Sequence, residues 1–112
     1  MTGPIVISMG DPAGIGPETI AKAWDARRER ALPPFVAVGD RRAIARVWNG
    51  PVAAVSDLNA VPEVFGEALP VLTVQDAGEI VPGVPDIDGA RCAVRALELA
   101  TGLVRSGAGR AL

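Results

Sequence analysis

The sequence predicts an α/β fold with a largely parallel sheet. Short apolar segments rich in β-branched residues alternate with longer amphipathic segments along the 112 residues, and this alternation is typical of βαβ units. The first apolar segment, Ile5–Ile7, leads directly into a glycine-rich turn and a helix that starts with a proline. We therefore expect part of a three-layer α/β/α domain, and at this length one domain at most.

The composition excludes several classes of protein. The net charge is −2, only two Phe and two Trp are present with no Tyr, and no basic block stands out, so we expect no nucleic-acid binding. No segment reaches the ~20 apolar residues of a membrane span, and no signal-like region precedes the first strand. We therefore expect a cytoplasmic protein without a membrane partner. The single cysteine, Cys92, lies among apolar positions and is expected to be buried rather than nucleophilic.

The turn from Gly10 to Gly16 is the stretch most suited to binding. It contains three glycines and one proline, and Pro17 and Glu18 then suit the first turn of a helix. Free backbone N–H groups at such a point bind phosphates or carboxylates. The glycine spacing is neither G-x-G-x-x-G nor a nucleoside-triphosphate loop. A tight connection without a ligand therefore remains an equal alternative, and Asp11 either contacts a ligand or ties the turn through its own side chain.

Helical spacing and breaker residues predict the next elements in order. A first helix is expected over Pro17–Arg30, with a strand after it at Phe35–Val38. A second helix follows, capped by Asp40 and reaching about Asn49. The residues expected to face the core of these helices are Ile20, Ala23, Trp24, Ala31, Ala43, Ile44, Val47 and Trp48. The arginines of the second helix, expected to point outward, are Arg41, Arg42 and Arg46.

The second half contains two more predicted strands and one long helix. The strands are Pro51–Val55 and Leu69–Val74, whereas Ser56–Glu67 has no clear pattern. Gln75–Asp88 is expected to be a loop that borders a site or packs on a partner. Asp88 is expected to cap a helix reaching Ser106. Its predicted buried stripe is Ala93, Ala96, Leu97, Ala100, Leu103 and Val104, with Arg91, Arg95, Glu98 and Arg105 outward. A helix this apolar predicts self-association or a partly disordered C-terminal end.

The segment Met9–Glu18 resembles, residue for residue, the N-terminal signature of the 4-hydroxythreonine-4-phosphate dehydrogenase family of vitamin B6 biosynthesis. It is also similar to the Gly-Asp-Gly-Ile-Gly-Pro-Glu turn of isocitrate and isopropylmalate dehydrogenases, which implies their architecture. Val38–Asp40 and the stretch from Gly83 into the last helix resemble later parts of the same family in the same order. The resemblance spans this chain but only the first third of a family member. It therefore implies the N-terminal part, residues 1–112, of one truncated α/β dehydrogenase domain.

The resemblance implies a homodimeric enzyme that uses NAD (or NADP) to oxidise 4-phosphooxy-L-threonine, a small phosphorylated hydroxy-amino acid, which then loses carbon dioxide. Family members bind a divalent metal (zinc, magnesium or cobalt) through three histidines, and this chain has none. The family's catalytic motifs lie beyond Leu112. The resemblance therefore assigns no catalytic and no metal-binding residue here, and it implies that the fragment is inactive alone. The cofactor contacts that it implies are the backbone of Gly14, Ile15 and Gly16, with Asp11 and Pro12 shaping the turn.

Three other functions are compatible with the sequence. A paralogous dehydrogenase of phosphorylated four-carbon sugar acids, such as phospho-threonate or phospho-erythronate, would share the Met9–Glu18 signature. A non-catalytic binding or oligomerisation module is compatible with the missing histidines. An unrelated phosphate-binding α/β domain would use the same glycine turn.

Overall fold

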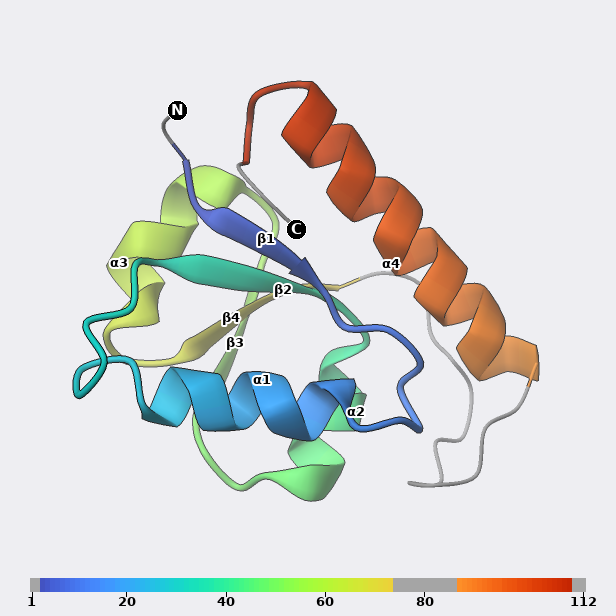
Figure 1. The fold of residues 1–112 in the computed structure, drawn as a ribbon, viewed down its shortest axis with the longest axis horizontal. Helices are drawn as coiled ribbons and strands as arrows, with labels where there is room; N and C mark the ends of the chain where they lie inside the picture. Colours follow the sequence, from blue (N-terminus) through green and yellow to red (C-terminus); the bar gives the residue numbers. More distant parts are fainter. Residues whose placement is uncertain (1–2, 74–86, 110–112) are drawn as a thin grey trace.

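The computed structural model describes residues 3–73 and 87–109. Its sheet has four strands, all pairing in parallel, in the order β1-β2-β4-β3 (Figure 1). The strands are β1 (Ile5–Ser8), β2 (Phe35–Gly39), β3 (Val52–Val55) and β4 (Leu69–Thr73). The helices are α1 (Gly16–Asp25), α2 (Arg41–Val47), α3 (Val61–Phe65) and α4 (Ile87–Arg105), with a 3₁₀ turn, η1 (Leu58–Ala60). The expected parallel α/β architecture is confirmed.

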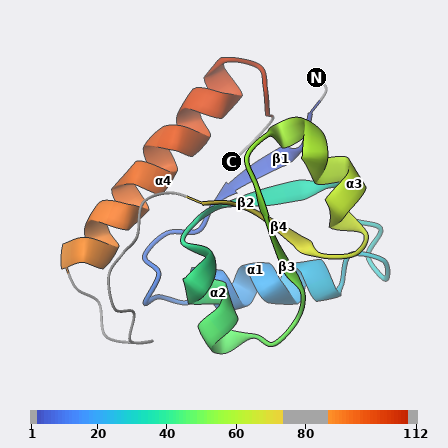
Figure 2. The same cartoon turned by 180° about the vertical axis from the view of Figure 1, so that it is seen from behind.

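Helices cover both faces of the sheet. In Figures 1 and 2, α1 and α2 lie on one side, whereas α4 lies on the other. Strand β2 is buried along its whole length because its alternate side chains enter two different cores. Phe35 and Ala37 pack with residues of α1 and α2, whereas Val36 and Val38 pack with Ala96 of α4. No helix within residues 3–73 and 87–109 has both the length and the apolar character needed to cross a bilayer.

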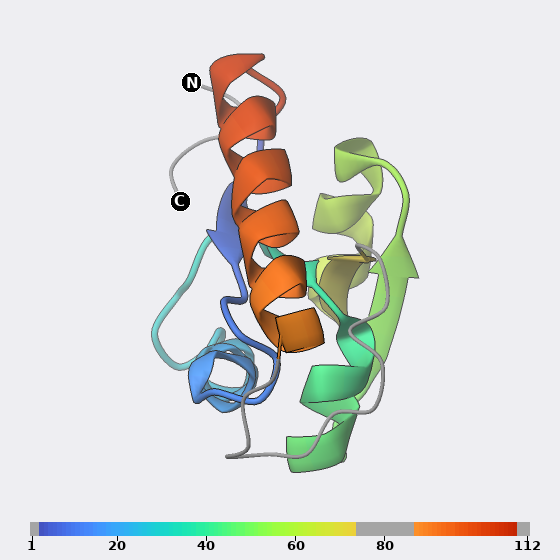
Figure 3. The same cartoon turned by 90° about the vertical axis from the view of Figure 1, so that its right-hand side faces the viewer.

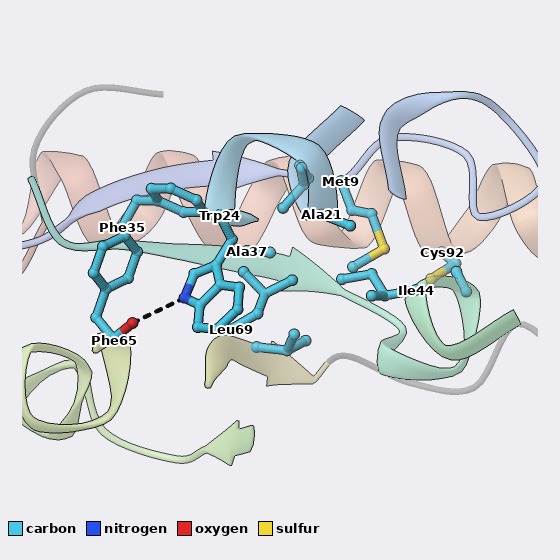
Figure 4. Packing of buried hydrophobic residues seen from close by; sticks show 12 residues of the cluster. Met9, Ala21, Trp24, Phe35, Ala37, Ile44, Phe65, Leu69 and Cys92 are labelled. Carbon is cyan, nitrogen blue, oxygen red and sulfur yellow. Dashed lines mark hydrogen bonds between the residues drawn. The ribbon is translucent and has the colours of Figure 1, made fainter. Parts of the chain in front are cut away.

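Trp24 lies in the core between the sheet and helices α1 and α2, as expected from its helical position. Its indole Nε1 donates a buried hydrogen bond of 2.9 Å to the carbonyl oxygen of Phe65 (Figure 4). The ring meets Trp48 edge-to-face with centroids 5.6 Å apart, and the Arg27 guanidinium lies 3.4 Å from its centroid. Trp24 thereby joins α1, α2 and the end of α3.

The predicted end of the first helix at Arg30 is wrong, because α1 ends at Asp25 and turns follow. The Arg27 side chain donates to the carbonyl oxygens of Trp24 and Gly66, at 3.0 and 2.8 Å. The contact with Gly66, which is 39 residues away in the sequence, stabilises the chain in a non-helical turn. Ala31 is exposed and has a φ of 51°, so its assignment to the buried stripe is also wrong.

The second helix forms as predicted at its start but ends early. Asp40 caps it by accepting from the Arg42 backbone N–H at 2.9 Å, whereas Trp48 is already extended. The Trp48 indole instead donates to Asp25 Oδ2 at 3.1 Å. Val47 is 38% exposed, which places it outside the core. Arg41 and Arg46 are exposed as predicted, whereas the Arg42 side chain folds back onto Asp40 and is only partly exposed.

The last helix begins one residue before the predicted cap, so Asp88 lies inside α4 rather than before it. Leu97 is 51% exposed, which contradicts its place in the buried stripe. Ala96 and Ala100 are buried as predicted, Leu103 and Val104 pack against the same core, and Cys92 is also buried. The four charged residues predicted to point away are all exposed. The Ser56–Glu67 segment, unassigned from sequence, contains η1 and α3. The predicted loop lies outside the described residues except at its last two positions, which belong to α4.

The two tryptophans allow a matched test of this packing. Trp24→Phe removes a buried donor and leaves the Phe65 carbonyl oxygen unsatisfied, so we expect a loss of about 2 kcal/mol in the free energy of unfolding. Trp48→Phe removes an exposed hydrogen bond to Asp25 but keeps an aromatic ring beside Trp24, so it should cost less than about 1 kcal/mol. Denaturant unfolding followed by circular dichroism measures both. Equal losses in the free energy of unfolding would show that the buried Trp24 hydrogen bond stabilises the protein no more than the exposed Trp48 bond does.

Candidate functional site

The glycine turn between β1 and α1 is closed by the side chain and the backbone of Asp11. Asp11 Oδ1 accepts from the Ala13 N–H at 2.8 Å, and its carbonyl oxygen accepts from the Gly14 N–H at 2.9 Å. Gly10 adopts a φ of 76°, in the region that favours glycine. The sequence left two roles open for Asp11, contacting a ligand or closing the turn, and in the structure Asp11 closes the turn. Pro12, which belongs to this turn, is buried.

Met9 fixes the turn to the edge of the sheet. Its N–H donates to the Val38 carbonyl oxygen at 2.9 Å, so pairing with β2 continues past the end of β1. A Cβ on Gly16 would overlap the Met9 carbonyl oxygen, and a Cβ on Gly39 would lie 2.7 Å from the Met9 Cβ. Figure 4 shows the Met9 side chain extending toward Ile44 inside the core. The two glycines therefore allow the turn to lie directly on the carboxyl ends of β1 and β2.

The N-terminus of α1 retains free backbone donors. Ile15 is the N-cap, but no side chain caps this end, and Pro17 has no N–H. Within the described ranges, the N–H groups of Ile15 and Gly16 have no hydrogen-bond partner, whereas Gly14 donates inside the turn. Ile15 is 81% exposed. The donors predicted at Gly14, Ile15 and Gly16 are therefore reduced to the last two, at the positive end of the helix dipole.

An ion pair between a buried carboxylate and a partly exposed guanidinium lies at the same edge, at the end of β2. Asp40 is 1% exposed, and its Oδ2 lies 2.6 Å from Arg42 Nη2. Asp40 also accepts from Arg42 Nε, so the guanidinium is held in one orientation. The Arg42 side chain is 43% exposed. This edge therefore carries one fixed positive group that solvent reaches. The sequence predicted the cap at Asp40 but gave no signal for the ion pair.

Cys92 of α4 lies beside this edge. Burial is the main reason that the pKa of the thiol is raised, and the nearby carboxylates of Asp40 and Asp11 raise it further. The backbone of Asp40 and the charge of Arg42 oppose that shift in pKa. Cys92 is buried, as predicted, and its raised pKa disfavours the reactive thiolate. Asp11, Asp40 and Arg42 therefore all lie near enough to Cys92 to affect the pKa of its thiol.

The chemistry of the described residues fits an anionic ligand better than a metal ion. Among residues 3–73 and 87–109, no three His, Cys, Asp or Glu side chains are placed to hold a metal. Two free amides, a helix N-terminus and the partly exposed Arg42 favour a phosphate or carboxylate instead. A hollow of about 490 Å³ lies at the ends of β3 and β4, away from the glycine turn. It is lined by Ser56, Asp57, Leu58, Asn59, Leu72, Leu103 and Ala108. The sequence did not predict this hollow, because four of its lining residues lie in Ser56–Glu67, a segment with no clear pattern.

Comparison with known proteins extends the sequence resemblance. No family model matches the chain. It is 41% identical over 109 residues to the 4-hydroxythreonine-4-phosphate dehydrogenase of Zymomonas mobilis, and 45% identical over 114 residues to that of Xanthobacter autotrophicus. Each match covers 97% of this chain and 32% of the relative. The chain is a homologue of the 4-hydroxythreonine-4-phosphate dehydrogenases. It spans about a third of the length of the curated relatives it matches.

Solved structures agree with this relationship. A structure described as a putative 4-hydroxythreonine-4-phosphate dehydrogenase from Salmonella typhimurium matches with a TM-score of 0.75 and 26% identity, covering 96% of this chain and 36% of that one. The Klebsiella pneumoniae enzyme has a TM-score of 0.76 at 24% identity, covering 96% and 35%. The resemblance inferred from Met9–Glu18 is therefore confirmed, and the relatives' names indicate an oxidoreductase family.

The contribution of the Asp40–Arg42 ion pair to stability can be tested by comparing Asp40 with Asp57, a second aspartate that caps a helix. Asp40→Asn keeps the helix cap but removes the charge that holds Arg42, so we expect a loss of about 1–3 kcal/mol in the free energy of unfolding. Asp57→Asn is the control, because Asp57 caps η1 by the same bond, to Asn59, but is exposed. Its cost should stay below about 0.5 kcal/mol. Similar costs in the two variants would contradict a stabilising role for the ion pair.

Proposed function

We propose that this chain forms the cofactor-side wall of a 4-hydroxythreonine-4-phosphate dehydrogenase, working as part of a protein of the relatives' length. The reaction is the NAD- or NADP-dependent oxidation of 4-phosphooxy-L-threonine, followed by loss of carbon dioxide, in vitamin B6 biosynthesis. The observation that carries the proposal is 41–45% identity to dehydrogenases of that name over 97% of the chain. We further propose a cytoplasmic homodimer, as the resemblance implies.

The residues of this chain have a binding role in the proposal. The amides of Ile15 and Gly16, with the α1 dipole behind them, would bind the anionic phosphates of the dinucleotide. Asp11 and Pro12 hold the turn in shape, and Met9 fixes it to the sheet. When bound, the nicotinamide accepts the hydride from the substrate alcohol. The divalent metal of the family does not fit this chain by itself, because it has no histidine, and no step here depends on one.

A paralogous dehydrogenase is the second candidate. A structure described as a terephthalate 1,2-cis-dihydrodiol dehydrogenase from Burkholderia xenovorans shares this fold with a TM-score of 0.70, at 23% identity. Dehydrogenases named for different substrates therefore share the architecture. The fold therefore does not fix the substrate, and a phosphorylated four-carbon sugar acid is kept as the alternative. A non-catalytic module remains the third candidate, and the following experiment separates it from an enzyme.

The test replaces the matching 109 residues of the Zymomonas mobilis enzyme with this chain. We expect the chimera to form NADH from NAD and 4-phosphooxy-L-threonine, measured by absorbance. A chimera that folds and dimerises like the parent, but forms no NADH, would contradict the proposal. It would instead favour a non-catalytic module.

The same chimera tests the cofactor site through Ile15. Asp and Asn cap helices equally well, so Ile15→Asp and Ile15→Asn differ mainly in charge. A carboxylate beside the cofactor phosphates should raise the KM for NAD about tenfold above that of the Asn variant, with a similar kcat, since tenfold corresponds to about 1.4 kcal/mol. Because Ile15 is 81% exposed, neither change should unfold the chain. Equal KM values for NAD in the two variants would contradict cofactor binding at this turn.

A further inference from the structure

We draw no further inference here: the strongest candidate, the exposed apolar face that Ile87, Val94 and Leu97 form on helix α4 (Figure 3), carries nothing, because nothing in the structure shows what covers it.

Discussion

The close backbone contact between Gly16 and the Met9 carbonyl is the constraint on which the site depends. Helix α1 starts directly against the last residue of the β1 extension, and a Cβ at Gly16 would overlap that carbonyl oxygen. Met9 is 2% exposed and is held on its other side by Gly39, at the end of β2. The first turn of α1 therefore has little freedom to move relative to the sheet, and its free amides keep a fixed position.

This arrangement explains why the polar groups of the structure gather at one edge. The carboxyl ends of parallel strands lie on the same side of a sheet, and ligands of α/β proteins bind there. The turn after β1 brings Asp11 and the amides of Ile15 and Gly16 to that edge, and the turn after β2 brings Asp40 and Arg42. The carboxylates already have internal partners. The groups left for a ligand are the amides of Ile15 and Gly16, which favour an anion.

Local chemistry in the sequence was enough to predict the elements around the turn. The apolar run, the glycines and Pro17 specify strand, turn and helix start within a few residues, and Asp40 specifies a cap. The predictions that were wrong concern features that depend on contacts between residues far apart in the sequence. Helix α1 ends early because Arg27 reaches the Gly66 carbonyl oxygen, and the orientation of Arg42 depends on a carboxylate that only the fold buries. In α4, alternative apolar stripes overlap, so periodicity alone could not place Leu97 outside the core. A ligand at the turn remains a proposal.

The most direct test of the central constraint compares two glycine-to-alanine variants by denaturant unfolding. Gly16→Ala forces a Cβ against a backbone oxygen that cannot move aside, so the account predicts a loss of about 3 kcal/mol or more in the free energy of unfolding. Gly102→Ala is the control, because its Cβ would meet nothing within 4 Å and alanine favours the interior of α4 by up to about 1 kcal/mol. A Gly16→Ala variant as stable as the wild type would contradict the account.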